Sequence, residues 1–185
     1  IRIVNADGTG AHNVTSPFFG NDYGPRFSPD GAKVVIASNF ENNSLVSTYE
    51  VYTINPDGTA RTNLTNASGS PDFYPSWSPD GSKIVFIGLS PSFTNSDIYV
   101  MDADGRNVRR LTDHGGNDHD PTWLPDGQSL VFSSDRDRGK GRLDLYRLWL
   151  DGTVERANVL TSANHDDRLL LPPPRPPTWF GSAGR

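Results

Sequence analysis

Short apolar runs alternate with clusters of turn-forming residues along most of the chain. The runs at residues 33–37, 83–87 and 129–133 each contain three or four consecutive β-branched, aliphatic or aromatic side chains. Runs this short, bounded by Pro, Asp and Gly, predict β-strands, and their continuous apolar character predicts that they are buried on both faces. Helical periodicity is missing between them, so a βαβ fold is not expected.

Two further strands follow each of these runs. Residues 50–54, 97–101 and 144–148 are strand-like and each ends in an Asp-Gly turn. The last strand of each unit ends in Leu-Thr or Val-Thr, and the copies are at residues 14–15, 64–65, 111–112 and 160–161.

A second turn motif repeats in step with the first. An aromatic residue followed by x-Pro-Asp-Gly occurs at residues 27–31, 77–81 and 123–127. Proline presets φ for the first turn position, Asp bonds its own backbone and Gly takes the positive φ that closes a tight reversal. Both motifs recur with a period of about 46 to 50 residues, which is typical of a repeat architecture.

Four short strands in each unit predict an all-β chain, a β-propeller fragment made of four-stranded antiparallel blades. We expect repeats over residues 1–165, with whole blades near 22–65, 72–112 and 118–161 and a partial blade at 1–16. Residues 166–185 form a Pro-rich tail in which the repeat degenerates. Since proline cannot donate to a sheet ladder, this tail is expected to be polyproline-like or disordered.

The ends of the chain suggest a fragment. Ile1 stands in what reads as the middle of a strand, so we expect further residues upstream. The tail is either a natural linker or the result of a truncated or altered reading frame, and we favour the second explanation. Three blades do not close a ring, so we expect apolar blade faces that self-associate or need missing blades, unless residues 1–16 pair with the C-terminal end.

Composition narrows the classes of partner. The formal net charge is −5, the pI is near 5.2 and no basic run is longer than a pair, which argues against nucleic acid. The longest apolar stretches, such as residues 84–89, are too short to span a bilayer. Cysteine is missing from the sequence, which excludes disulfides and thiol chemistry.

The segments 74–86 and 97–105 resemble the WD-like, Pro-Asp-type (PD40) repeat of TolB-like propellers. The resemblance covers residues 1–165 and implies a non-catalytic scaffold that binds a protein or a small ligand at the propeller channel. It also implies a periplasmic or secreted location. Similar repeats occur in gating propellers of prolyl-oligopeptidase-like serine peptidases and in metal-dependent sugar-acid lyases, which remain the alternatives because a fold alone does not select a function.

An acidic residue precedes the proline that opens each blade by three positions. These residues are Asp22, Asp72 and Asp118, with Asp167 in the degenerate copy. A ring of carboxylates near the channel would suit Ca²⁺ or a basic partner group. Recurrence in every repeat favours the other interpretation, in which each aspartate caps a turn amide.

Histidines supply the remaining candidate chemistry. His114 and His119 lie among acidic residues, and His165 echoes them one repeat later. Imidazole beside carboxylate suits a metal site or a general base, although the spacing matches no established metal signature. We expect His114, His119, Asp167 and the repeated aspartates at the channel mouth, and we expect the basic segments 109–110 and 136–142 to form solvated salt bridges.

Catalytic motifs are missing from the sequence. It has no Gly-x-Ser-x-Gly nucleophile elbow and neither common phosphate-binding glycine loop. No catalytic residue and no cofactor site is therefore predicted.

Overall fold

The computed structural model describes residues 1–16, 20–40, 48–66, 70–90, 92, 94–137 and 142–157. Within these residues all regular structure is β-strand, which confirms the predicted all-β propeller fragment. None of the described segments forms a helix that could cross a lipid bilayer.

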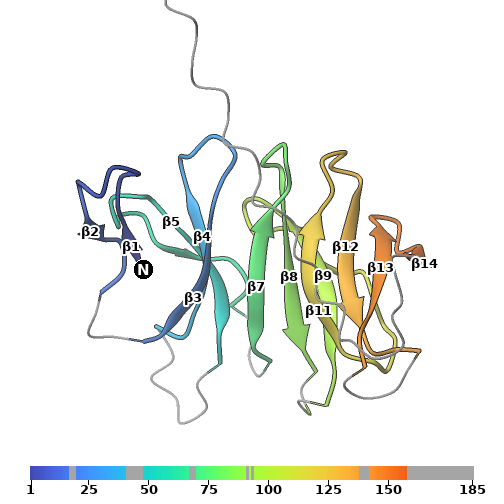
Figure 1. Ribbon diagram of the computed structural model, residues 1–185. Helices are drawn as coiled ribbons and strands as arrows, with labels where there is room; N and C mark the ends of the chain where they lie inside the picture. The colour runs from blue at the N-terminus through green and yellow to red at the C-terminus, as the bar shows by residue number, and fades with distance from the viewer. Residues whose placement is uncertain are drawn as a thin grey trace, which may run out of the picture.

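The strands form three four-stranded antiparallel sheets and one two-stranded ladder (Figure 1). The ladder pairs β1 (Arg2–Ile3) with β2 (His12–Asn13). The first blade consists of β3 (Asp22–Phe27), β4 (Val34–Ser38), β5 (Glu50–Ile54) and β6 (Thr62–Asn63). The middle blade consists of β7 (Asp72–Trp77), β8 (Lys83–Leu89), β9 (Ser96–Asp102) and β10 (Arg109–Arg110). The third blade consists of β11 (Asp118–Trp123), β12 (Ser129–Ser134), β13 (Asp144–Trp149) and β14 (Val154–Arg156).

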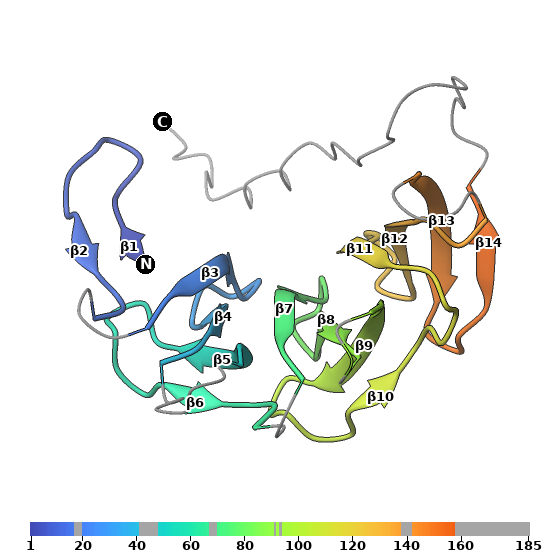
Figure 2. The same ribbon diagram turned by 90° about the horizontal axis from the view of Figure 1, so that it is seen from below.

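The blades stand side by side along an open arc (Figure 2). In every blade, consecutive strands pair in sequence order, so the first strand is at one edge of the sheet and the last strand at the other. Strands β3, β7 and β11 lie along the inner side of the arc, while β6, β10 and β14 lie along its outer side. The residues of β3, β7 and β11, including the first residue of each strand, therefore lie on the concave side of the arc.

The Pro-Asp-Gly motif forms the hairpin between the first two strands of each blade. In the middle blade, the Ser78 hydroxyl donates to Asp80 Oδ1 at 2.6 Å, and Asp80 Oδ1 accepts the Ser82 amide at 3.0 Å. The amide of Gly81 donates to the Ser78 carbonyl at 2.9 Å, with Gly81 at φ 73°. The Asp80 carboxylate thus accepts hydrogen bonds from a hydroxyl and a backbone amide of its own turn, as the sequence predicts.

The Asp-Gly turn between the third and fourth strands also contacts the preceding blade. Gly105 has φ 86°, and a Cβ added there would lie 2.9 Å from the carbonyl oxygen of Leu64 in the first blade. Glycine is required both by the left-handed backbone and by this close approach.

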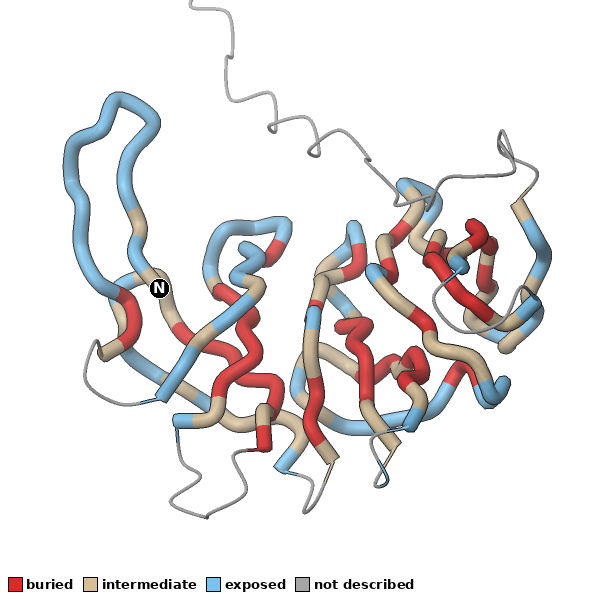
Figure 3. Tube along the Cα trace, turned by 60° about the horizontal axis from the view of Figure 1, so that its bottom comes forward, coloured by how far each residue is buried: buried red, intermediate tan, exposed pale blue. Residues whose placement is uncertain are grey.

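Apolar clusters hold neighbouring blades together. One cluster joins the N-terminal ladder to the first blade, a second joins the first blade to the middle blade, and a third joins the middle blade to the third. All residues of β4 and β5 are buried, and Figure 3 shows burial concentrated in the middle strands of each sheet. Burial on both faces of these strands is thereby confirmed.

Candidate functional site

The repeated aspartates occupy the first position of each innermost strand. Asp22, Asp72 and Asp118 begin β3, β7 and β11. The side chain of Asp22 is 5% exposed, while Asp72 is 6% and Asp118 0% exposed. The three carboxylates therefore lie within the blades near the channel, not on an open rim.

Two of these aspartates form ion pairs with arginine side chains. In the third blade, Arg136 Nη2 donates to both carboxylate oxygens of Asp118, at 2.9 and 3.1 Å. In the first blade, Arg61 Nη2 donates to Asp22 Oδ1 at 3.2 Å. Bonds of this kind satisfy a buried carboxylate, so among the described residues the structural role of Asp22 and Asp118 rests on ion pairs instead of capping of turn amides.

Aromatic rings form the other wall of both arginine sites. The Arg136 guanidinium carbon lies 4.9 Å from the ring centroid of Phe132 and 5.0 Å from that of Tyr146. The Arg61 guanidinium is 4.3 Å from the Phe40 ring. These are cation–π distances, and the side chain of Arg136 is only 10% exposed. The expectation of a solvated salt bridge is therefore wrong for Arg136, because its guanidinium is enclosed between a carboxylate and two rings.

The middle blade has a pocket at the corresponding place. The pocket has a volume of about 400 Å³, and its walls include Asp72, Asp97, Tyr99 and Val108. Within the described part of the chain no cationic side chain forms an ion pair with Asp72.

Burial changes the protonation of Asp72. Loss of solvent raises the pKa of the carboxyl to about 7, the Thr65 hydroxyl beside it lowers the pKa, and the Glu50 carboxylate raises it. Asp72 thus gains and loses a proton near neutral pH, unlike a solvated aspartate.

A second carboxylate lines the same pocket. Asp97 Oδ2 accepts from Arg110 Nη2 at 2.7 Å and from Asn95 Nδ2 at 3.2 Å. Asp97 Oδ1 is buried and has no hydrogen-bond donor among the described residues. Burial raises the pKa of Asp97, and the hydrogen bond and charge of Arg110 oppose this rise.

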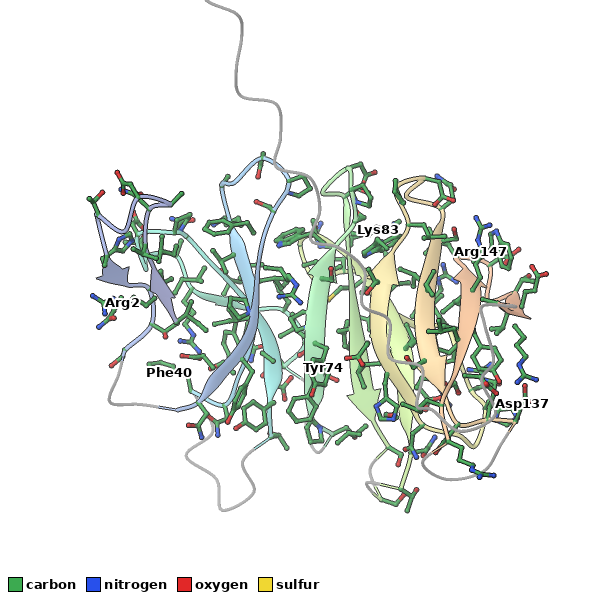
Figure 4. The ribbon with its side chains drawn as sticks, in the orientation of Figure 1. Arg2, Phe40, Tyr74, Lys83, Asp137 and Arg147 are labelled. Atoms are coloured by element: carbon green, nitrogen blue, oxygen red, sulfur yellow. The ribbon has the colours of Figure 1, made fainter. Side chains whose placement is uncertain are left out.

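Four aromatic side chains form a row across the first and middle blades, which we call the aromatic row. Ring centroids are 5.5 Å apart for Tyr23 and Tyr49, 4.9 Å for Tyr49 and Phe73, and 6.2 Å for Phe73 and Tyr74. Tyr23 is 54% and Tyr74 59% exposed. Figure 4 shows Tyr74 near the lower end of β7, where that strand begins. Sequence reasoning missed this row.

A repeated β-bulge sets the direction of the Tyr74 side chain. The register of the innermost strand shifts just before its proline in all three blades. The residue before that proline has a left-handed backbone, with φ 60° at Gly24, 52° at Tyr74 and 50° at Asp120. An aromatic residue in this conformation costs about 1–2 kcal/mol relative to glycine, so Tyr74 is held there by its surroundings.

The histidine candidates do not assemble into a site within the described residues. His114 is exposed, and its Nδ1 accepts the Gly116 amide at 3.3 Å. His119 is half-buried on β11. His165 and Asp167 lie outside the described residues. In the part of the chain that the structure describes, no group of three or more His, Asp or Glu is placed to hold a metal ion, so calcium binding stays a prediction without structural support.

Two family models match the sequence. The TolB β-propeller domain matches residues 75–169, and the dipeptidyl peptidase IV N-terminal region matches residues 28–120. No curated protein matches the chain.

Solved structures give the same fold. TolB from Acinetobacter baumannii is 29% identical with a TM-score of 0.66, covering 84% of this chain and 36% of that one. A protein described as putative TolB from Agrobacterium tumefaciens is 30% identical with a TM-score of 0.66, covering 82% and 51%. A puromycin-hydrolyzing peptidase from Mycobacterium tuberculosis has a TM-score of 0.66 at 17% identity, covering 86% and 29%.

The chain spans between about a third and a half of the length of the two TolB structures. The TolB family model matches half of the chain, and the two motifs of the repeat stand at the hairpins that define each blade. The chain therefore belongs to the TolB β-propeller family.

Proposed function

We propose that this chain is a non-catalytic binding module that recognises a protein partner at the end of the blades where the innermost strands begin. The observation that carries the proposal is the aromatic row of Tyr23, Tyr49, Phe73 and Tyr74. Both ends of the row are more than half exposed.

The position of the row favours binding over a role in the core. The row links β3 of the first blade to β7 of the middle blade, and an apolar cluster packs these two blades together. Tyrosine and phenylalanine supply large contact areas at low entropic cost and are enriched at protein interfaces. The residue before the proline has a left-handed backbone in all three blades, and in the middle blade this position carries the exposed ring of Tyr74.

Selection of peptides tests the proposal. A phage-displayed peptide library is selected on the wild-type chain, and the selected peptides are then measured on Tyr23→Ala and on Tyr74→Asn by calorimetry. Asparagine is chosen at position 74 because it tolerates a left-handed backbone. We expect each substitution to weaken binding by about tenfold or more, the loss expected when an aromatic anchor is removed.

A matched aromatic control is available on the same strand as Tyr23. Phe27 is 53% exposed at the other end of β3 and is outside the aromatic row. Phe27→Ala should leave affinity unchanged. Equal affinity of the selected peptides for all the variants, or selection of no peptide, would contradict the proposal.

The second candidate is the propeller domain of a peptidase of the prolyl-oligopeptidase type. The match of the dipeptidyl peptidase IV N-terminal region to residues 28–120 favours it. In that case the chain gates access to a catalytic domain elsewhere in the protein. Sequencing the full reading frame separates the two candidates, since an attached α/β domain with a nucleophile elbow supports the peptidase, whereas further propeller repeats and a signal peptide support a periplasmic or secreted binding propeller.

A further inference from the structure

The arginine sites of the first and third blades share one plan. A guanidinium lies between the first aspartate of the blade, a serine directly opposite on the second strand, and an aromatic ring of the same sheet. In the third blade, Arg136 Nε donates to Ser134 Oγ at 3.0 Å in addition to its bonds with Asp118. In the first blade, Arg61 bonds to both Ser38 and Asp22.

The two arginines come from different positions of the repeat, although their guanidinium groups bind the equivalent aspartate and serine of their blades. Arg136 follows the second strand of its blade, and Arg61 precedes the fourth strand. The same interaction is therefore built twice from unrelated positions of the repeat, which shows that the place itself suits a guanidinium.

The middle blade keeps the aspartate and lacks the arginine and the serine. Strand register aligns Gly88 with Ser38 and Ser134, because these residues pair with Asp72, Asp22 and Asp118 respectively. Counted from these pairs, Ser90 takes the place of Arg136, and Val108 takes the place of Arg61. Both replacements line the pocket of about 400 Å³.

The remaining walls of the pocket match the arginine sites. The ring centroids of Phe86 and Tyr99 are 5.5 Å apart, as are those of Phe132 and Tyr146 in the third blade, although the first pair is stacked and the second is tilted. Asp72 is 94% buried, with 6% of its surface exposed, and Asp97 adds a buried oxygen that lacks a donor among the described residues.

Negative charge is in excess around the pocket. Asp72 and Asp97 both line the pocket, and the carboxylate of Glu50 is close enough to Asp72 to act on its charge. The cation of the pocket wall is Arg110, which is already bonded to Asp97 and to the Thr112 carbonyl. A cation entering the pocket would therefore reduce the cost of burying these charges.

We propose that this pocket of the middle blade binds a guanidinium group supplied by another molecule, with Asp72 as its carboxylate partner and the rings of Phe86 and Tyr99 beside it. A planar guanidinium fits because it forms paired hydrogen bonds to a carboxylate and stacks on aromatic faces, as Arg136 does one blade away. The inference concerns a different surface from the aromatic row and holds or fails independently of it.

Two probes of similar shape, one charged and one neutral, test whether the pocket recognises the charge of a guanidinium group. Nα-acetylarginine amide and Nα-acetylcitrulline amide are titrated into the wild-type chain at pH 8 by calorimetry. We expect the arginine compound to bind about tenfold or more tightly than the citrulline compound, since only the guanidinium is charged. Equal affinity of the two compounds would overturn the proposal.

Two variants place the missing arginine inside the pocket. Ser90→Arg imitates Arg136, and Val108→Arg imitates Arg61. Either variant should abolish binding of the arginine compound and raise the unfolding temperature, because an internal guanidinium then pairs with Asp72. Ala32→Arg adds the same charge at an exposed hairpin outside the pocket and should leave binding unchanged. Undiminished binding by a folded Ser90→Arg or Val108→Arg protein, with folding checked by circular dichroism, would show that the site is elsewhere.

A peptide distinguishes the two sources of the guanidinium. A capped pentapeptide with a central arginine is compared with the small amide. Tighter binding of the peptide identifies an arginine of a polypeptide partner as the source, while equal affinity identifies a small guanidine compound. Both results support the proposal. If neither the peptide nor the small amide binds, the proposal is overturned.

Discussion

The ionisation of Asp72 predicts an unusual dependence of stability on pH. Its pKa in the folded protein is about 7, against 3.8 for the unperturbed carboxyl. Between these values the folded chain holds a proton that the unfolded chain has released. The contribution of this group to stability is therefore fully present below pH 3.8 and is lost as the pH rises through 7.

The magnitude follows from the two pKa values. The difference between 3.8 and about 7 corresponds to about 4 kcal/mol at a pH above both. Asp72→Asn keeps the shape of the side chain and stays neutral at every pH. We expect the variant to be more stable than the wild type by about 2–4 kcal/mol at pH 8, with the lower figure allowing for the new N–H₂ group, which needs an acceptor. Near pH 4 the two proteins should differ by less than about 1 kcal/mol.

Equilibrium unfolding in urea at pH 4, 6 and 8, followed by tryptophan fluorescence, measures this difference. Asp80→Asn is the matched control, because it removes the same charge from an exposed turn. Hydrogen bonds from Ser78 and Ser82 lower the pKa of Asp80 to about 2, so its contribution is present above pH 3.8 and is lost as the pH falls through 2. Asp80→Asn should therefore weaken the fold at pH 8, with the opposite sign to Asp72→Asn. A stability gain for Asp72→Asn that is the same at pH 4 and pH 8 would show that ionisation of Asp72 does not lower the stability of the fold, since the cost of a buried charge must grow with pH.

Three further perturbations test other parts of the structure by the same unfolding assay. Arg136→Met should destabilise the chain by about 3–5 kcal/mol because it leaves Asp118 buried without its cation, and a loss below about 1 kcal/mol would contradict the assignment. His12 contacts two backbone carbonyls that raise its pKa, so its contribution should be present in acid and decline as the pH rises above the usual histidine range, and His12→Gln should flatten that part of the profile. Gly105→Ala should cost about 1–3 kcal/mol through its left-handed backbone and close interblade contact, whereas Gly115→Ala, with nothing within 4 Å of its added Cβ, should be nearly neutral.

The fold could be predicted from the sequence because its signals are local. Each Pro-Asp-Gly and Asp-Gly motif closes a hairpin through hydrogen bonds between residues a few positions apart, as Asp80 and Ser82 show. The two turn motifs in a fixed order mark the strands of a blade, and their repetition indicates a series of stacked blades. The positions of Asp22, Asp72 and Asp118 at the start of the innermost strands followed from the same repeat.

The partners of these aspartates could not be predicted, because they are not local. Arg61 is 39 residues from Asp22, and Arg136 is 18 residues from Asp118. Arg136 follows the second strand of its blade and Arg61 precedes the fourth strand, so an alignment of the repeats does not place the two arginines at the same position. Only the packing of an outer strand or loop over the sheet brings both guanidinium groups to one place.

The aromatic row could not be predicted because the backbone conformation of Tyr74 is unusual for a residue in a strand. A residue that precedes proline is normally extended, which would direct Tyr74 as an ordinary strand residue. The β-bulge instead gives it a left-handed φ of 52° and exposes its ring. The repeat contained one usable signal, since Gly24 occupies the equivalent position and glycine before proline in a strand indicates an irregular backbone.

The differences among the blades carry more functional information than their similarities. Residues shared by all three blades close turns or fill the cores, and a common fold requires them. The middle blade has Gly88 where both neighbours have serine, and neither Ser90 nor Val108, at the two positions that supply an arginine in one neighbour each, carries a charge. Asp72 is a buried carboxyl without a cationic partner among the described residues, and in such a place an apolar or amide side chain would be more stable. A carboxyl of this kind beside a pocket of about 400 Å³ is the arrangement expected when a ligand supplies the cation.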